Sequence, residues 1–267
     1  MSSKKESVAR TLTVALLVCL VCSVVVSAAA VALKPVQTTN RLQDKQRNIL
    51  QIAGLYDESR SIEEQFSQIT PRLVDLRTGE FSDAQDPLTF DQQKPSKDPD
   101  MSQQLTGEQD IASIRRRADY STVYVVENPD GSIKTLILPI HGYGLWSTLY
   151  GFLALEPDAN TVSGLGFYEH AETPGLGGEV DNPKWKALWE GKKLYGEQGE
   201  VEIQVIKGTV DSKTANAEHK VDGLAGATLT SNGVSNLLRF WVGENGFGPY
   251  LKRMQQGDAV EQQEGDA

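Results

Sequence analysis

An uninterrupted apolar run near the N-terminus dominates the pattern of hydrophobic and polar positions along the chain. Residues 11–33 (TLTVALLVCLVCSVVVSAAAVAL) form a stretch of 23 residues without a charged side chain. At ~1.5 Å per residue a helix of this length spans about 34 Å, enough to cross a hydrocarbon core of roughly 30 Å. The pattern therefore predicts one transmembrane helix over residues 11–33.

The charges that precede this run predict its orientation. Lys4, Lys5 and Arg10 come before it, and positive residues stay on the cytoplasmic side of a membrane. Residues 1–10 are therefore expected in the cytoplasm and the rest of the chain beyond the membrane. A cleaved signal peptide is the alternative, because residues 27–32 (SAAAVA) offer small side chains. The apolar run exceeds the roughly 7–15 residues of a signal peptide's apolar region, which favours a retained anchor.

The next segment, residues 34–120, is mostly polar and is predicted to be a membrane-proximal region of helices and loops. A polar helix is expected over residues 39–55. Ser61 and Glu64 have the spacing of a capping box and predict the start of a short second helix. Residues 91–110 contain two prolines and few large apolar side chains, which is typical of a surface loop.

Shorter apolar stretches between turn residues follow in residues 121–255. Strands are predicted over residues 121–127, 132–140, 161–169 and 201–207, with a hairpin turn at 128–131 (NPDG) between the first two. Because strands and helices are mixed without βαβ regularity, we predict an α+β domain. The last residues, 256–267, are rich in Gln, Glu, Asp and Gly and form a predicted acidic tail.

Two helices are well marked within this domain. Asn182 can cap a helix whose first residue is Pro183. A second helix has apolar side chains at the spacing i, i+3, i+4, i+7, namely Val234, Leu237, Leu238 and Trp241. We expect this helix to begin near Thr230, behind a cap at Thr230 or Ser231, and to end before Gly243.

Composition excludes several classes of protein. The net charge of −10 disfavours a nucleic-acid partner, because phosphate binding needs a basic face. The two cysteines, Cys19 and Cys22, lie inside the apolar run and are interpreted as small side chains facing lipid or another helix. Two cysteines and three histidines support neither a disulfide scaffold nor a metal centre.

Residues 221–233 (VDGLAGATLTSNG) place glycines, small side chains and hydroxyls directly before the second predicted helix. The N-terminus of a helix favours an anion such as phosphate, because its free backbone N–H groups and its dipole point there. From these residues alone, the segment is either an anion site or only a tight turn into a capped helix.

Residues 222–228 (DGLAGAT) resemble the flavinylation motif of the covalent-FMN-binding family, D-G-x-[S/T]-G-A-T. The resemblance implies that FMN is joined to Thr228 through a phosphodiester bond. Ala225 departs from the motif, where the family has Ser or Thr. A threonine hydroxyl is a poor nucleophile and no His or Lys lies beside it in the sequence. The resemblance therefore implies a separate flavin transferase, which would read Asp222 or bind its metal with the help of Asp222. The alternative role for Asp222 is a cap of the N-terminal turn.

Further segments make the resemblance more specific. Residues 33–37 (LKPVQ), 44–50 (DKQRNIL), 139–147 (PIHGYGLWS) and 170–178 (HAETPGLGG) are similar to the C-subunit family of the Na⁺-translocating NADH:quinone oxidoreductases. The resemblance implies a single-pass protein of the bacterial inner membrane with a periplasmic FMN domain that carries electrons. NADH, quinone and sodium sites are then expected on other subunits, and no G-x-G-x-x-G dinucleotide motif opens a helix after a strand here.

The middle motifs supply candidate contacts to the flavin. Leu145, Trp146 and Leu176 are expected to cover the ring, with ordinary core packing as the alternative for Trp146. Glu172 and Thr173 are expected to bond the polar edge of the ring or the ribityl chain. Lys207 is a candidate for the phosphate or the ring, or a plain surface lysine. The remaining predicted cofactor-binding residues are glycines or neighbours of Thr228: Gly144, Gly223, Gly226, Ala227, Leu229 and Thr230.

Two other functions remain open at this point. The G-subunit of the related Rnf electron-transport complex shares the flavinylation motif. An exported module without redox chemistry, which uses the turn at Thr228 to bind an anion, belongs to a different class. Bound flavin would distinguish the two electron-transfer subunits, those of the NADH:quinone oxidoreductase and of the Rnf complex, from the module without redox chemistry.

Overall fold

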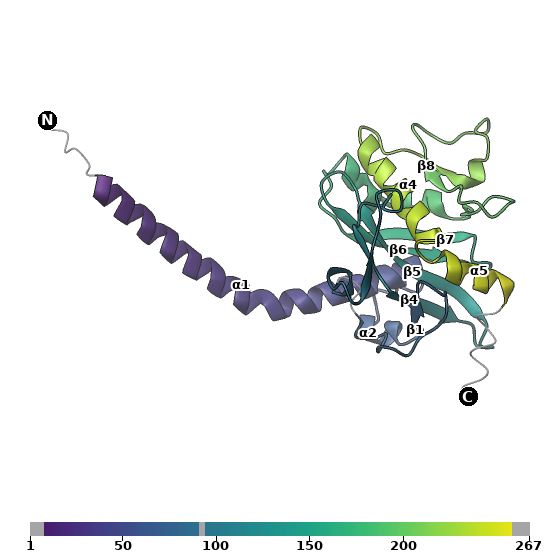
Figure 1. The fold of residues 1–267 in the computed structure, drawn as a ribbon, viewed down its shortest axis with the longest axis horizontal. Helices are drawn as coiled ribbons and strands as arrows, with labels where there is room; N and C mark the ends of the chain where they lie inside the picture. Colours follow the sequence, from purple (N-terminus) through teal and green to yellow (C-terminus); the bar gives the residue numbers. More distant parts are fainter. Residues whose placement is uncertain (1–7, 91–93, 258–267) are drawn as a thin grey trace. The chain divides into compact units, whose positions relative to one another are not determined.

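The computed structural model describes residues 8–90 and 94–257 and divides the chain into two compact units, before and after the boundary between Lys45 and Gln46 (Figure 1). Lys4, Lys5 and nearly all of the predicted acidic tail lie outside the described residues. The helices are α1 (Val8–Ile52), α2 (Ile62–Phe66), α3 (Pro183–Lys186), α4 (Thr228–Val242) and α5 (Gly248–Gln256). The strands of the main sheet are β1 (Ile69–Asp75), β4 (Tyr120–Glu127), β5 (Ile133–Tyr143), β6 (Thr148–Leu155) and β7 (Val162–Glu169).

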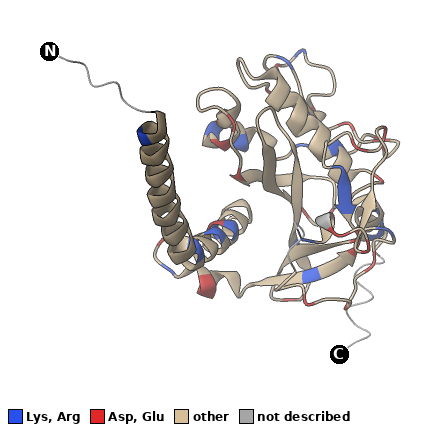
Figure 2. Ribbon diagram, turned by 60° about the vertical axis from the view of Figure 1, so that its left-hand side comes forward, with Lys and Arg blue, Asp and Glu red and all other residues tan. Residues whose placement is uncertain are grey.

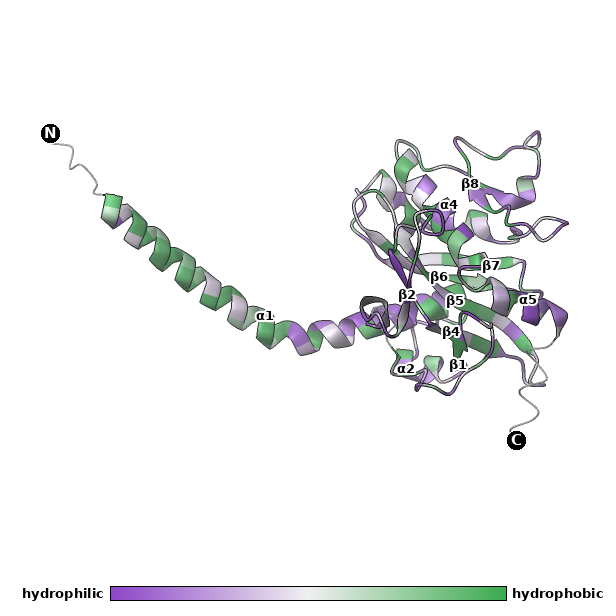
Figure 3. Cartoon of the chain, in the orientation of Figure 1, coloured by the Kyte–Doolittle hydropathy of each residue, from purple (hydrophilic) through white to green (hydrophobic). Residues whose placement is uncertain are grey.

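Helix α1 contains the apolar run and is long and apolar enough to cross a membrane, with a mean hydropathy of 2.9 in its best window. Figures 2 and 3 show this part of α1 as a long uncharged and hydrophobic stretch. Its large apolar side chains are exposed, and Cys19 and Cys22 are exposed free thiols. The helix continues through Pro35 to Ile52, so the polar helix predicted after Pro35 is the second half of the same element.

The domain is built on a five-stranded antiparallel sheet in the order β1-β4-β5-β6-β7. The predicted turn at 128–131 joins β4 to β5, with the Gly131 N–H donating to the Asn128 carbonyl at 2.9 Å. Two short two-stranded ladders accompany the sheet: β2 (Ser102–Gln104) with β3 (Arg116–Ala118), and β8 (Gln204–Val205) with β9 (Lys220–Val221).

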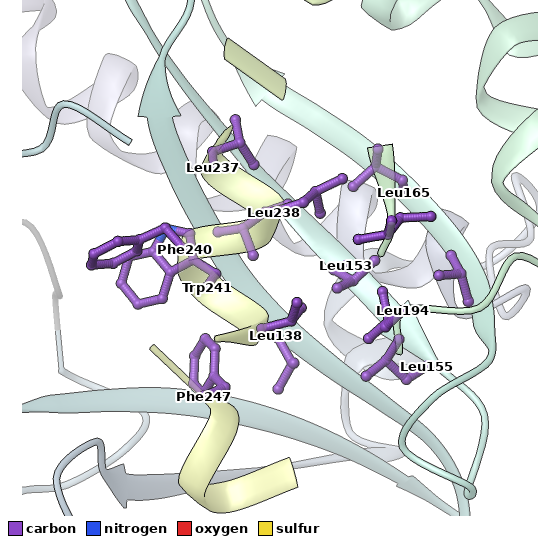
Figure 4. Packing of buried hydrophobic residues seen from close by; sticks show 14 of the residues in the cluster. Leu138, Leu153, Leu155, Leu165, Leu194, Leu237, Leu238, Phe240, Trp241 and Phe247 are labelled. Carbon is purple, nitrogen blue, oxygen red and sulfur yellow. The ribbon is translucent and has the colours of Figure 1, made fainter. Parts of the chain in front are cut away.

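Alternate side chains of the sheet face two separate hydrophobic layers. Tyr124, Ile137 and Phe152 pack against Ile49 and Leu50 of the last turns of α1. The other face carries the larger core, where side chains of β5, β6 and β7 meet the apolar face of α4 (Figure 4). The labelled members of this core are Leu138, Leu153, Leu155, Leu165, Leu194, Leu237, Leu238, Phe240, Trp241 and Phe247. The core thus fixes α4 against the sheet and with it the segment that precedes α4.

The predicted α+β fold with one long apolar N-terminal helix is confirmed, with corrections to individual elements. Helix α4 begins at Thr228, with Ala227 as its N-cap, two residues before the predicted start. Thr230 and Ser231 do not cap the helix because their hydroxyls bond Glu172 and the Leu224 N–H. Strands β1, β2, β3, β6 and β9 were not predicted. Of these, β1, β2 and β3 lie within the segment expected to hold helices and loops, and β2 lies within the predicted surface loop 91–110. The strand expected over 201–207 is only Gln204–Val205.

Candidate functional site

The first turn of α4 carries the residue for which covalent modification is predicted. Thr228 is the first residue of the helix, and both Thr228 and Leu229 are exposed. Ala227 has no side chain that can accept a hydrogen bond, so α4 begins without a side-chain cap. The first backbone N–H groups of a helix have no partner within it. This start therefore suits an external anion.

The other hydroxyls of this turn point into the protein. Thr230 is fully buried and its Oγ1 donates to Glu172 Oε2 at 2.7 Å. Ser231 is 5% exposed and its Oγ accepts from the Leu224 N–H at 3.0 Å. Thr228 differs from both because its hydroxyl lies on an exposed residue. Of the three neighbouring hydroxyl residues, only Thr228 is exposed and therefore accessible for modification by another protein.

The turn that leads into α4 depends on its glycines. Gly226 has φ +71°, in the left-handed region that favours glycine. The Gly223 N–H donates to the Gly208 carbonyl at 2.8 Å. A Cβ at Gly223 would lie 2.3 Å from the Ile206 carbonyl oxygen. The two backbones can therefore pack this closely only where residue 223 is a glycine.

Asp222 also stabilises the turn that leads into α4, through two hydrogen bonds. Its Oδ1 accepts from the Val210 N–H at 2.8 Å, and its carbonyl accepts from Trp185 Nε1 at 2.8 Å. The exposed Lys207 belongs to the loop that these contacts tie to residues 222 and 223. Trp185 and Asp222 are 37 residues apart in the sequence, so local sequence patterns do not reveal this contact.

Glu172 joins α4 to the segment after β5. Its Oε1 accepts from the Leu145 and Trp146 N–H groups, each at 3.0 Å, while Oε2 accepts from Thr230. The side chain is 5% exposed. Burial raises its pKa, but the hydrogen bonds from Thr230 and the two amides outweigh this and hold the pKa of Glu172 below its ordinary value. Glu172 is therefore an ionised clamp between two segments, a role that its sequence position did not indicate.

Three glycines allow this clamp to form. A Cβ at Gly144 would lie 2.6 Å from Glu172 Oε1, and one at Gly177 would lie 2.6 Å from both Glu172 Oε2 and Thr230 Oγ1. A Cβ at Gly233 would lie 2.6 Å from the Tyr143 carbonyl oxygen. Three segments, residues 143–146, 172–178 and 226–233, are thus packed together without intervening side chains.

These three segments expose large apolar side chains. Trp146 is 65% exposed, Leu229 59%, Leu176 44% and Leu145 36%. Trp146 is therefore not a core residue, which removes the alternative left open for it. A Cβ at Gly226 would lie 2.9 Å from Leu176 Cδ2, so Leu176 lies against the turn before α4. Apolar side chains beside an exposed hydroxyl fit a flat aromatic ligand attached at Thr228.

Two further residues of the middle motifs are placed as follows. Thr173 is exposed, and its carbonyl accepts from the Leu176 and Gly178 N–H groups, which shapes the loop. His141 stacks on Tyr150 and receives the Trp241 Nε1 hydrogen bond on its carbonyl. Burial lowers the pKa of His141 to about 4, so this ring is neutral at pH 7. Among the described residues, no group of His, Cys, Asp or Glu side chains could hold a metal ion.

Comparisons with known proteins agree with this geometry. Residues 144–243 match the FMN-binding domain family, a range that includes Leu145, Glu172 and Thr228. The C-subunit of the Na(+)-translocating NADH-quinone reductase from Pseudomonas aeruginosa is 61% identical, over 96% of this chain and 100% of the relative. The C-subunit from Yersinia pestis is 52% identical over 94% of this chain and 95% of the relative.

Solved structures give the same result. The crystal structure of Shewanella oneidensis NqrC is 34% identical and has a TM-score of 0.72, covering 79% of this chain and 96% of that one. The structure of the C-subunit from Parabacteroides distasonis is 27% identical, with a TM-score of 0.64, and covers 82% of this chain and 96% of that one. Sequence, fold and site thus lead to one conclusion: the chain belongs to the C-subunit family of the Na(+)-translocating NADH-quinone reductases.

Proposed function

We propose that this chain is the membrane-anchored electron-transfer subunit of a sodium-translocating NADH–quinone reductase and that it carries FMN bound covalently to Thr228. The observation that carries the proposal is the exposed Thr228 hydroxyl at the uncapped start of α4. The bond would join Thr228 Oγ1 to the FMN phosphorus as a phosphodiester. The family match to an FMN-binding domain supports the cofactor.

The start of α4 suits the phosphate. A phosphodiester keeps about one negative charge, and a charge at a helix N-terminus gains roughly 0.3–1 kcal/mol when exposed. Ala227 supplies no competing cap, so the first-turn N–H groups remain available to the phosphate oxygens. Lys207 and Thr173 stay predicted contacts to the cofactor.

The exposed apolar side chains suit the ring. Leu145, Trp146 and Leu176 would cover the isoalloxazine, and Glu172 would keep the segment of Leu145 and Trp146 at a fixed distance from α4. FMN supplies the capacity to accept and pass on electrons singly. The contribution of the chain is to fix the ring, exclude water from part of it and set the charge around it.

Attachment requires help from another protein. A threonine hydroxyl is a poor nucleophile without a base beside it. The Asp222 carboxylate accepts from the Val210 N–H, a contact that holds it in the turn before α4. We propose that a flavin transferase reads the exposed turn and transfers the FMN unit to Thr228 from a flavin dinucleotide. Thr228 Oγ1 loses its proton and bonds to the FMN phosphorus while the pyrophosphate bond to the nucleoside monophosphate breaks, so that this monophosphate is the leaving group. Other subunits of the reductase would then provide the electron donor and acceptor.

The anchor and its orientation are the second part of the proposal. We propose that α1 spans the bacterial inner membrane and that the domain lies on the periplasmic side, because Lys4, Lys5 and Arg10 precede the apolar run. Protease added outside spheroplasts should remove residues after the anchor while the intact inner membrane protects cytoplasmic markers. Full protection of the domain in a correctly inserted protein would contradict this topology.

Thr228→Val tests the attachment. It should abolish flavin fluorescence in a denaturing gel, since the variant has the same shape but no hydroxyl. Thr230→Val is the matched control and should keep the fluorescence, because the Thr230 hydroxyl is buried against Glu172. Fluorescence that persists in Thr228→Val would refute the assignment. Absence of fluorescence in the wild type, coexpressed with a transferase, would favour the module without redox chemistry. The Pseudomonas and Yersinia relatives are named as C-subunits of the Na(+)-translocating NADH-quinone reductase, which supports this family over the G-subunit of the Rnf complex.

A further inference from the structure

His170 lies directly behind the Glu172 clamp and makes two well-defined contacts. Its Nε2 lies 2.7 Å from Asp181 Oδ2. Its Nδ1 accepts a hydrogen bond from the backbone N–H of Glu172 at 3.2 Å. The His170 side chain is 13% exposed and the Asp181 side chain 51%, so the contact with Asp181 lies at the surface and the contact with the Glu172 N–H is partly buried.

These contacts require one particular form of the ring. A carboxylate accepts hydrogen bonds, so the proton belongs on Nε2, and the Glu172 N–H requires a bare lone pair on Nδ1. The neutral ring with its proton on Nε2 satisfies both partners. A second proton on Nδ1 would face the Glu172 N–H and break that contact. The protonation state of His170 is therefore linked to the backbone position of Glu172.

Residue 172 in turn determines how the segments of the site are held. Its carboxylate receives the Leu145 and Trp146 N–H groups and the Thr230 hydroxyl. The neighbouring Ala171 N–H donates to Ser147 Oγ at 2.7 Å, which adds a second link to the segment after β5. A continuous set of hydrogen bonds thus runs from Asp181 through His170 to the first turn of α4.

We propose that His170 is a positioning residue, held by Asp181, that fixes the Glu172 clamp and makes the potential of the bound flavin depend on protonation of His170. The proposal rests on the proposed attachment of FMN beside this clamp. His170 does not touch the reacting atoms in this scheme and acts through Glu172.

The charges around His170 determine whether its protonation raises or lowers the potential of the flavin. Asp181 on the segment before α3 and Glu172 on the same loop are anionic, while Lys186 of α3 lies 3.8 Å from Asp181 Oδ1. The hydrogen bond to Asp181 raises the pKa of His170, and burial opposes this in part. As the pH falls through that pKa, a positive charge appears behind the clamp. Reduction adds negative charge to the flavin, so protonation of His170 should raise the potential.

Linkage makes the effect reciprocal. If protonation of His170 favours the reduced flavin, reduction must favour protonation of His170 by the same free energy. Reduction and uptake of this proton would then occur together in the pH range where His170 titrates. The protonation of the flavin itself contributes its own inflection, which should remain in a variant that has no titrating side chain at residue 170.

The test is a redox titration of the full-length, flavinylated protein in detergent at a series of pH values. The wild type should show an inflection in the potential that is absent from His170→Asn. The asparagine Oδ1 can still accept from the N–H two residues later, as in an Asx turn, so the clamp survives without a titrating ring. Asp181→Asn should move the inflection to lower pH, since it removes the charge that stabilises the imidazolium.

His219→Asn is the matched control. His219 is also buried, and it contacts other partners than the clamp: Nδ1 lies 2.9 Å from the Lys193 carbonyl oxygen and Nε2 3.7 Å from Glu202. This variant should keep the wild-type pH profile. Since the chain has three histidines, ¹⁵N-histidine NMR can also report the tautomer of His170 directly. A wild-type profile in His170→Asn would overturn the proposal, and so would a neutral ring that carries its proton on Nδ1 at a pH above the titration of His170.

Peptide mass spectrometry on each variant separates the two hypotheses. An FMN adduct on Thr228 with an unchanged pH profile in His170→Asn would refute the role of His170 alone. An adduct on another residue would refute the proposed attachment at Thr228.

Discussion

Helices α3 and α4 differ in how the backbone N–H groups of their first turns are capped. A side chain next to α3 in the sequence caps its first turn, whereas α4 has no side-chain cap. In α3, Asn182 accepts from the Lys184 N–H at 3.0 Å and Pro183 occupies the first position. In α4, the N-cap is Ala227, and the hydroxyl of Thr230 is bonded by a carboxylate 58 residues away. A structural helix satisfies its first turn locally. The start of α4 instead leaves its N–H groups open, which is where an anionic cofactor gains most.

Substitution of Glu172, the carboxylate that bonds Thr230 of α4, should have the largest effect, and this effect is on the free energy of unfolding. Glu172→Gln places an amide NH₂ against donors from Leu145 and Trp146 or from Thr230, and we expect it to cost about 2 kcal/mol of unfolding free energy at neutral pH. Because the pKa of Glu172 is lowered in the fold, its stabilisation is present above the ordinary value of 4.5 and is lost as the pH falls through the folded pKa.

Thermal unfolding from about pH 7 to about pH 3 checks this prediction, since ionised Glu172 contributes only at the upper end. The wild type and Glu172→Gln should differ most near neutrality and converge on acidification. A constant difference across the range would show that the charge of Glu172 is not what holds the clamp.

A side-chain cap added to α4 should have the next largest effect. Ala227→Asp supplies the missing cap and also a negative charge beside the phosphate, so we expect flavinylation to slow by about tenfold, equivalent to ~1.4 kcal/mol. Ala227→Ser adds a cap without a charge and should slow it less. Loading is measured by flavin fluorescence after timed exposure to the transferase.

The matched change in α3 is Asn182→Ala. It should cost about 1 kcal/mol of stability, as is typical for loss of a cap, and leave flavin loading unchanged. Equal loading of the wild type and Ala227→Asp would mean that the open first turn of α4 is not used by the phosphate.

The smallest effect is expected from a charge placed on the exposed side of the same turn. Leu229 is 59% exposed, so Leu229→Asp should fold and remain flavinylated at Thr228. The added charge disfavours the reduced flavin and should lower its potential. Salt screens this interaction, so the shift in potential should be smaller at high ionic strength. Redox titrations at low and high ionic strength measure the shift. A wild-type potential at low salt would contradict placement of the flavin beside residue 229.

The same contrast explains how far the sequence predicted the molecule. The caps at Asn182 and Ser61 and the turn at 128–131 involve neighbours in sequence, and all are present. Of the predicted capping box, the structure has the bond from the Glu64 N–H to Ser61, while the Glu64 carboxylate pairs with Arg60. The start of α4 was misplaced because Thr230 and Ser231 look like caps, while their hydroxyls bond Glu172 and the Leu224 N–H instead. Tertiary partners decide such positions, and local patterns do not contain them.

The missed strands have a similar cause. Strand β6 is buried on both faces over most of its length, so its side chains show no alternation, and Gly151 interrupts the run. Strand β1 contains Pro71 and lies at an edge of the sheet, where proline is tolerated. For the site, the resemblance supplied Thr228 and the glycine-rich loops. The clamp by Glu172 and the link to His170 became visible only in three dimensions.

Mass analysis of one peptide tests attachment at Thr228 most directly. Trypsin cleaves after Lys220 and Arg239 and releases residues 221–239, which contain Thr228, Thr230 and Ser231 together. In protein coexpressed with a transferase, this peptide should carry one FMN as a phosphodiester, and fragment ions should place it on Thr228. An unmodified peptide, or an adduct on Thr230 or Ser231, would contradict the proposed site.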